Sequence, residues 1–150
     1  MASDLILASL HHVLVFSMFA IYAVEVAVLK PGLTGDGVAR LARIDGVYGA
    51  VATGVIIVGI ARVIWGLKGW EYYSGYGVFW AKMAAVALVG ILSVPPTIRF
   101  RRWLAAAKTD PAYSVTREEI ASLRPFLHGQ GFVLLLIPVL AAMMARGVFY

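Results

Sequence analysis

Four long apolar segments alternate with shorter polar ones along the chain, and this pattern predicts the architecture. The apolar segments cover residues 5–29, 44–65, 78–94 and 125–145. Each reaches or approaches the roughly 20 apolar residues that a helix needs to cross a bilayer. Pro31, Gly66 and the Pro95-Pro96 pair are expected to end the first three helices. The pattern therefore predicts an all-α fold, with one transmembrane four-helix bundle formed by residues 1–150.

Residues 99–124 form the one long connection between these segments. Within it, Thr116-Arg117-Glu118-Glu119 has the sequence of a helix start, with acidic residues in the first turn. We therefore expect a short interfacial helix between the third and fourth spans. This helix should be amphipathic and lie on the cytoplasmic surface of the membrane.

The composition supports a membrane protein and excludes several kinds of chemistry. Of the 150 residues, 61% are hydrophobic and 14% are charged, whereas soluble domains are roughly half apolar and about a quarter charged. Cysteine is absent, which excludes disulfides, thiol catalysis, iron–sulfur clusters and thiolate-bound metals. The net charge of +5 comes mainly from loops between apolar segments, which favours orientation in a membrane over nucleic-acid binding.

The basic residues also predict which way the helices run through the membrane. Nine lie on the side of the first and third loops: Lys30, Arg40, Arg43, Arg99, Arg101, Arg102, Lys108, Arg117 and Arg124. Three lie on the opposite side: Arg62, Lys68 and Arg146. By the positive-inside rule, we expect a multi-pass protein of the bacterial inner membrane, with the first and third loops cytoplasmic and both termini outside. The outer side also carries a predicted aromatic belt, which consists of Tyr72, Tyr73, Tyr76, Phe79 and Trp80.

Ionisable side chains inside the apolar segments are the best indication of function. They are His11, His12, Glu25, Asp45, Arg62, Lys82 and His128. A charge at membrane depth costs about 2.5–3.5 kcal/mol on insertion scales. A protein that only occupied lipid would not carry so many.

Helical spacing groups these residues into two clusters at different depths. His11 and Glu25 share one face of the first helix, and Asp45 and Arg62 share one face of the second. In the outer half we expect a basic cluster of His11, Arg62 and Lys82, with His12 and Trp80 beside it. In the inner half we expect an acidic cluster of Glu25, Asp45 and His128, with Arg43, Tyr48 and Thr97 nearby.

Several of the outer residues also have a plain structural interpretation. Arg62 and Lys82 could extend to lipid headgroups from shallow positions. His12 is rotated about 100° from His11 around the helix. A hydrogen bond to a neighbouring helix is the favoured explanation for His12.

The basic cluster suits haem b better than a bare metal ion. Haem iron takes a histidine nitrogen, and haem propionates need cations near the membrane surface. His11 is therefore the expected iron ligand, and Arg62 and Lys82 the expected propionate partners. Trp80 and His128 complete the set of expected cofactor-binding residues, and no catalytic residue is assigned. A zinc or copper site would need several histidine or carboxylate ligands in one layer, and the cations would repel the ion.

Several segments resemble those of a family of small bacterial four-helix membrane proteins, a domain-of-unknown-function family. The matching segments are Leu10-His11-His12, Arg43-Ile44-Asp45-Gly46-Val47-Tyr48-Gly49, Phe79-Trp80-Ala81-Lys82, Pro95-Pro96-Thr97 and His128. This resemblance covers nearly the whole chain and implies no particular activity.

The chain also resembles the HemJ-type protoporphyrinogen oxidases. The resemblance rests on His11 early in the first helix, on Ser17 and the nearby Phe19, and on Trp80-Ala81-Lys82 in the third helix. Those enzymes are four-helix membrane proteins that bind haem b, oxidise protoporphyrinogen IX and pass electrons to a membrane acceptor. The resemblance implies that His11 ligates haem and that Lys82 contacts haem or porphyrin, although the spacing around Trp80 departs from that family. If the chain is an enzyme, this resemblance implies an oxidoreductase acting on porphyrinogen.

Two rival functions remain open. Glu25, Asp45 and His128 fit a small proton-coupled carrier. Alternatively, the two carboxylates could form ion pairs with Arg40 or Arg43, in a non-catalytic membrane subunit whose buried charges orient helices. The expected partners are the lipid bilayer, a porphyrin substrate, a membrane electron acceptor, and a second copy or a larger membrane complex, with no nucleic acid.

The charge bias leads to a topological prediction. A reporter fused at Asp110, in the third loop, should be cytoplasmic, and a reporter fused after Tyr150 should be external. Paired reporters that are active on opposite sides of the membrane measure this. The reverse result would exchange the sides of the membrane on which the two clusters lie. The same residues would still share each cluster.

Overall fold

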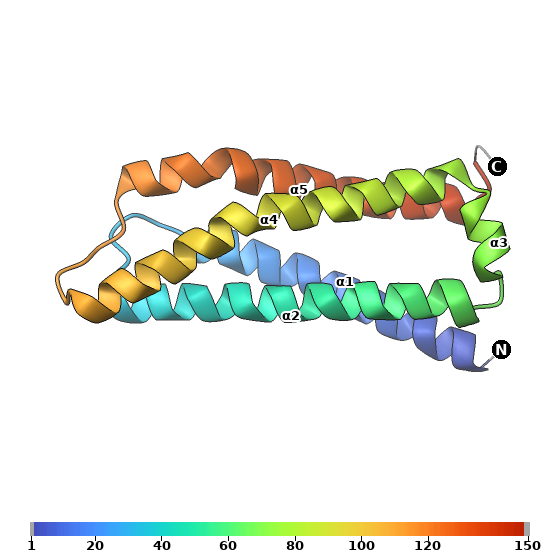
Figure 1. The fold of residues 1–150 in the computed structure, drawn as a ribbon, viewed down its shortest axis with the longest axis horizontal. Coiled ribbons are helices and arrows are strands. Elements are labelled where there is room, and N and C mark those ends of the chain that lie inside the picture. Colours follow the sequence, from blue (N-terminus) through green and yellow to red (C-terminus); the bar gives the residue numbers. More distant parts are fainter. Residues whose placement is uncertain (1, 149–150) are drawn as a thin grey trace.

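The computed structural model describes residues 2–148, which form an elongated antiparallel bundle of helices (Figure 1). Four helices are long: α1 (Ala2–Val28), α2 (Gly35–Trp65), α4 (Gly77–Thr109) and α5 (Arg117–Ala145). The short helix α3 (Gly69–Ser74) connects α2 to α4. The predicted all-α architecture with four spans is confirmed, because each long helix contains an apolar window suited to crossing a membrane.

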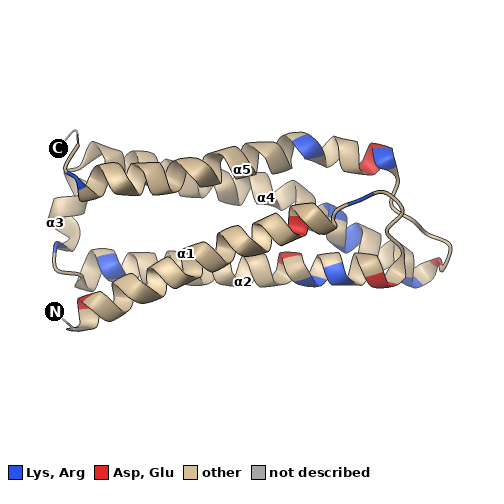
Figure 2. Cartoon of the chain, turned by 180° about the vertical axis from the view of Figure 1, so that it is seen from behind, with Lys and Arg blue, Asp and Glu red and all other residues tan. Residues whose placement is uncertain are grey.

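The long helices pack as two antiparallel hairpins. α1 packs along α2, and α4 packs along α5. α2 also packs on α4 and so joins the hairpins, whereas α1 meets α5 over a short stretch only. Both termini and α3 lie at one end of the bundle, called here the termini end (Figure 1). The α1–α2 and α4–α5 loops lie at the opposite end, called the arginine end (Figure 2).

Many large apolar side chains of the spans point away from the bundle. Phe16, Ile57 and Leu135, on three different helices, are each more than half exposed. Such a surface fits the hydrocarbon of a bilayer, where the helices satisfy their own backbone hydrogen bonds. The interior at mid-bundle is a core of buried side chains: Met18, Tyr48, Val89, Val133 and Leu134.

The third span is longer than predicted. α4 continues through Pro95 and Pro96 and ends at Thr109, so the prediction that this pair ends the helix is wrong. Each proline removes one backbone donor, but membrane helices tolerate prolines where neighbouring helices pack on them. Here Pro96, Phe100 and Trp103 lie along one buried face of α4, and this packing keeps the helix intact.

The described residues contain no separate interfacial helix between the third and fourth spans, so that prediction is wrong. The helix start at Thr116 is confirmed. The Thr116 hydroxyl accepts a hydrogen bond from Glu119 N, and the Glu119 carboxylate accepts one from Thr116 N. This capping box opens α5 itself, which runs through Pro125 to Ala145. A capping box marks where a helix begins and says nothing of where it ends, which explains the error.

The helices are longer than a bilayer is thick, and at the arginine end they continue beyond it. α4 has 33 residues, and at about 1.5 Å per residue it is about 50 Å long, against roughly 30 Å of hydrocarbon. The two loops at this end are joined by backbone hydrogen bonds from Gly32 N to Val115 O (2.9 Å) and from Val115 N to Leu33 O (2.9 Å). Beneath them lies a separate apolar core of Leu33, Val38, Leu41, Phe100, Trp103, Val115, Ile120, Leu123 and Leu127.

Glu119 ties the α4–α5 loop to this core. Its Oε1 accepts hydrogen bonds from the Trp103 indole (2.9 Å) and from the Tyr113 hydroxyl (3.1 Å). Burial and the hydrogen bond to Glu119 raise the pKa of Tyr113 to about 12. Tyr113 therefore remains a neutral donor at physiological pH. Charged side chains gather around this end of the bundle (Figure 2).

Aromatic side chains gather at the termini end, where the sequence predicts a belt. The rings of Tyr73 and Phe79 lie 5.5 Å apart, and Trp70 packs edge-on against Phe79 and Trp80. Tyr76 is fully buried, and its hydroxyl hydrogen bonds with the carbonyl oxygen of Met143 at the end of α5. The aromatic residues thus fasten the α3 connection to the end of the α4–α5 hairpin.

The short contact between α1 and α5 depends on Gly131. The Tyr22 hydroxyl donates a hydrogen bond to Leu127 O (2.6 Å), and a Cβ added at Gly131 would lie 2.6 Å from that hydroxyl. Gly131→Ala should displace the Tyr22 hydroxyl and lose the roughly 0.5–1.5 kcal/mol that such a hydrogen bond contributes. The expected result is a lower melting temperature of the detergent-solubilised protein.

Gly129→Ala is the matched control for this prediction. Gly129 lies on the same helix, and its added Cβ would meet Leu92 at 3.5 Å, an ordinary contact. Both substitutions change helix propensity equally. If the two variants melt at the same temperature, the Tyr22–Leu127 hydrogen bond does not contribute to stability.

Candidate functional site

The structure places His11 of α1 directly against α2. A Cβ added at Gly59 would lie 3.4 Å from His11 Cε1 and 3.8 Å from His11 Nδ1. Gly59 has no side chain, and this leaves room for the imidazole at the helix interface. The ring also lies near the backbone of Val55. His11 is therefore half-buried between the two helices of the first hairpin.

Arg62 and Lys82 join His11 in one cluster, named here the basic triad. Arg62 follows Gly59 by three residues on α2, and Lys82 lies on α4. Both cations interact electrostatically with the His11 ring, and Arg62 also interacts with Lys82. The structure thus brings together the three residues that the sequence places in one layer.

Among residues 2–148, the basic triad has no compensating anion. The buried atoms His11 Nδ1 and Arg62 Nε have no hydrogen-bond partner among the described residues. Asp4 shares the His11 face of α1, two turns away, but its carboxylate accepts a hydrogen bond from Leu67 N (3.3 Å). Like charges at membrane depth repel one another and are costly without a partner. An anionic ligand would relieve both costs.

His12 and Trp80 lie beside the triad in sequence, and both form hydrogen bonds outside it. The His12 ring lies edge-on to the His11 ring, with 6.3 Å between the ring centroids. His12 is exposed, and its Nδ1 hydrogen bonds with Ala8 O (2.6 Å) of its own helix. The prediction of a hydrogen bond to a neighbouring helix is therefore wrong, because the partner of His12 lies on α1 itself. The Trp80 indole donates to Ser74 O (3.0 Å), and its ring is half exposed. Trp80 belongs to the aromatic belt.

A second polar group, named here the acidic cluster, lies nearer the arginine end. Glu25 of α1 is 3% exposed and Asp45 of α2 is 7% exposed, and the two carboxyl groups interact electrostatically. Asp45 Oδ1 accepts a hydrogen bond from the Thr97 hydroxyl of α4 (2.7 Å). Gln130 of α5 is 1% exposed and donates from Nε2 to the Tyr48 hydroxyl (2.9 Å). All four spanning helices therefore contribute a polar side chain.

The predicted composition of the acidic cluster needs two corrections. His128 is exposed on α5 and lies outside the cluster, and Gln130 occupies the interior instead. The alternative in which Asp45 forms an ion pair with Arg40 or Arg43 does not hold either: Asp45 accepts a hydrogen bond from the neutral Thr97 hydroxyl, and both arginines are exposed.

Helical spacing along α5 could have identified Gln130. Four of the buried residues of this helix, Leu123, Leu127, Gln130 and Leu134, follow a 4-3-4 spacing along one stripe. A polar residue on that stripe must face the interior. Gln130 carries no charge, so a search for ionisable residues inside the spans finds His128 and not this neutral amide.

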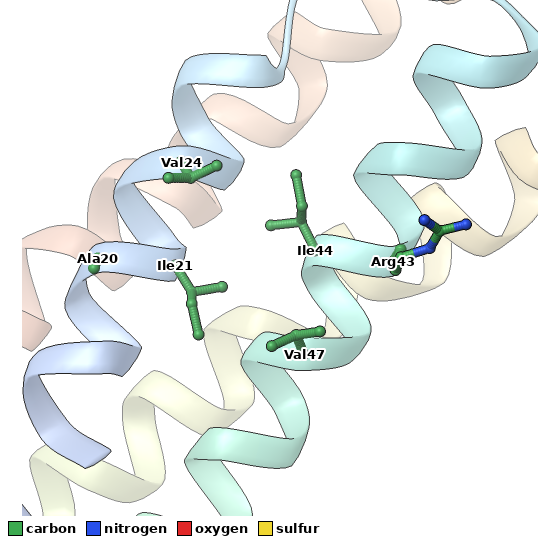
Figure 3. A pocket seen from close by; sticks show the side chains of 6 residues that line it. All are labelled: Ala20, Ile21, Val24, Arg43, Ile44 and Val47. Atoms are coloured by element: carbon green, nitrogen blue, oxygen red, sulfur yellow. The ribbon is translucent and has the colours of Figure 1, made fainter. Parts of the chain in front are cut away.

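Arg43 instead borders an apolar groove between α1 and α2. The groove has a volume of about 280 Å³ and is lined by Ala20, Ile21, Val24, Arg43, Ile44 and Val47. Ile21 and Val47 point toward one another across it, whereas the guanidinium of Arg43 points away (Figure 3). Such a groove suits a lipid acyl chain. Among the described residues there is also no group of three or more histidine, aspartate or glutamate side chains that could hold a metal ion.

The chain belongs to a family of membrane proteins. Residues 3–149 match the family model described as "Predicted membrane protein (DUF2214)". The family-level resemblance drawn from the sequence is therefore confirmed. No curated protein and no solved structure matches the chain, and the resemblance to the HemJ-type oxidases stays a prediction from the sequence.

The Asp45–Thr97 contact generates a stability prediction. Thr97→Val keeps the shape of the side chain but leaves a buried oxygen of Asp45 without its donor, a change that costs about 1–3 kcal/mol. The melting temperature in detergent should fall. Thr53→Val is the matched control, since the Thr53 hydroxyl is exposed and bonds only Gly49 O of its own helix. Equal melting temperatures for the two variants would place Asp45 in water rather than in a buried contact.

Proposed function

We propose that this member of the DUF2214 family of predicted membrane proteins binds haem b at the basic triad and has a redox role. The observation that carries the proposal is a half-buried histidine beside two cations, with no acidic partner. Haem b matches this set of groups, because its iron takes an imidazole nitrogen and its two propionates take cations.

The residues of the triad fit these roles individually. His11 would be the iron ligand, and its Nδ1 edge is packed toward Gly59, which leaves Nε2 as the ligating nitrogen. Arg62 and Lys82 would hold the propionates, since both interact electrostatically with the His11 ring. Trp80, on the exposed side of the aromatic belt, would contact the cofactor only at its edge. The bound haem would supply one-electron chemistry.

The proposed setting is the outer half of a bacterial inner membrane. The triad lies toward the termini end, and the nine basic residues of the first and third loops lie toward the arginine end. The positive-inside rule then places the triad near the external surface. The substrate class is a porphyrinogen, with electrons passing to a membrane acceptor. This part of the proposal is supported by the resemblance to the HemJ-type oxidases at His11 and Lys82.

Substitution of the two adjacent histidines tests the haem proposal. Wild-type protein purified from haem-replete cells should show a Soret band. His11→Ala should abolish that band or shift it strongly, because the sole axial ligand is lost and no cysteine can replace it. His12→Ala is the matched control and should leave the spectrum intact. Arg62→Ala and Lys82→Ala should weaken haem retention by roughly 1.5–3 kcal/mol each, the cost of a hydrogen bond to a charged group.

Two outcomes would contradict this proposal. A colourless wild-type protein would refute haem binding and leave the non-catalytic subunit as the better interpretation. Full Soret absorbance in His11→Ala would place the ligand elsewhere, with the exposed His128 as the next residue to substitute. Melting curves of every variant separate loss of haem from loss of folding.

A further inference from the structure

The acidic cluster is a second site that the proposed function does not use. Glu25 lies 14 residues after His11 on α1, which corresponds to about 21 Å along the helix axis. The two groups therefore lie at different depths of the bundle. The cluster is built from buried side chains of all four spans, so it needs an explanation of its own.

The hydrogen bonds of the cluster leave acceptors without donors. The Thr97 hydroxyl is used by Asp45, and the Tyr22 hydroxyl by Leu127 O. The Gln130 amide donates to the Tyr48 hydroxyl. Two buried oxygens, Glu25 Oε2 and Gln130 Oε1, have no partner among the described residues. Buried polar atoms are normally paired, so these two oxygens leave the hydrogen bonding of the cluster incomplete.

The cationic side chains of the bundle do not fill this need. Arg43 and His128 are exposed. Arg101 on α4 interacts electrostatically with Asp45, but it is exposed and lies one turn beyond Thr97 toward the arginine end. Glu25 Oε2 is thus left without a cationic partner among the described residues.

We propose that the acidic cluster is an exchangeable proton-binding site in which Glu25 takes up the proton. Glu25 gains one proton from water at the arginine end, becomes a neutral carboxylic acid that can donate a hydrogen bond, and returns the proton by the same route. Asp45 and Thr97 line that route. Tyr22, Asp45 and Tyr48 interact electrostatically with Glu25. Next to them, Thr97 and Arg101 of α4 interact with Asp45, and Gln130 of α5 donates to Tyr48.

The backbone favours a proton over a sodium ion. Metal cations need a shell of several oxygens, and sodium sites in membrane proteins take many of these from unwound helices. α1 and α2 contain no proline, so their carbonyl oxygens are used in helix hydrogen bonds. On α4, Pro95 and Pro96 each leave one carbonyl oxygen without its helix donor, which is fewer than a sodium shell needs. A proton needs only the side-chain oxygens that the cluster already has. Ionisable groups inside membrane bundles commonly serve proton pathways.

Infrared spectroscopy of the full-length protein tests this proposal without any haem signal. Lowering the pH should produce a carboxylic-acid carbonyl band that shifts in heavy water. Glu25→Gln should remove that band. Glu71→Gln is the matched control, because Glu71 is exposed on α3 at the other end of the bundle, and it should leave the band unchanged. Replacing potassium by sodium in the buffer should have no effect.

A second variant keeps the test decisive if Glu25→Gln does not fold. Tyr48→Phe retains the aromatic ring but removes a hydroxyl that interacts with Glu25, so the band should change in frequency. The absence of any pH-dependent band in wild-type protein would overturn the proposal, as would a band that neither substitution alters. A band that sodium suppresses and potassium does not would identify a sodium site instead.

Discussion

The absence of water in the hydrocarbon layer is the constraint on which the rest of this structure depends. Every backbone polar group inside the membrane must find its partner within the protein, and continuous helices meet that requirement. α4 keeps its helical course through Pro95 and Pro96 for this reason, with Pro96 buried against its neighbours. The same constraint turns the polar side chains of the spans inward. Glu25, Asp45 and Gln130 are the buried polar residues of the bundle among those described.

Part of the bundle lies beyond the membrane-spanning segments of the helices. α2, α4 and α5 are longer than a bilayer requires, and their extensions share the apolar core around Phe100 and Trp103. Outside the membrane, water drives the burial of such side chains, and the interior there resembles that of a soluble domain. Most of the lysine and arginine positions lie toward this end of the bundle (Figure 2). One end of the bundle is thus held together by a packed apolar core and the other by an aromatic belt.

The two polar groups along the bundle lack different kinds of partner. The basic triad of His11, Arg62 and Lys82 has no anionic partner among the described residues, whereas two buried oxygens of the acidic cluster around Glu25 have no hydrogen-bond partner there. A group that is costly to bury persists where a ligand offsets the cost. The haem proposal supplies an anionic ligand for the first group, and the proton proposal supplies a donor for the second. Together they would place electron and proton chemistry in one small membrane protein, at different depths.

The sequence by itself determined the class of fold, the number of spans and the layer in which each ionisable residue lies. Apolar run length and helical periodicity are local properties, so His11, Glu25 and Asp45 could be placed on interior faces without a structure. Only the tertiary structure decided which neighbours those residues meet. In the structure, Asp45 accepts a hydrogen bond from Thr97, and Gly59 lies against His11. His128 is exposed, and Gln130 is the α5 residue that lies in the interior. These outcomes depend on how the helices rotate and cross, and packing between helices sets both.

The same reason explains the ends of the helices. A proline pair or a capping residue has a local preference, but burial of the neighbouring face decided that α4 continues and that the capping box at Thr116 opens a single long helix.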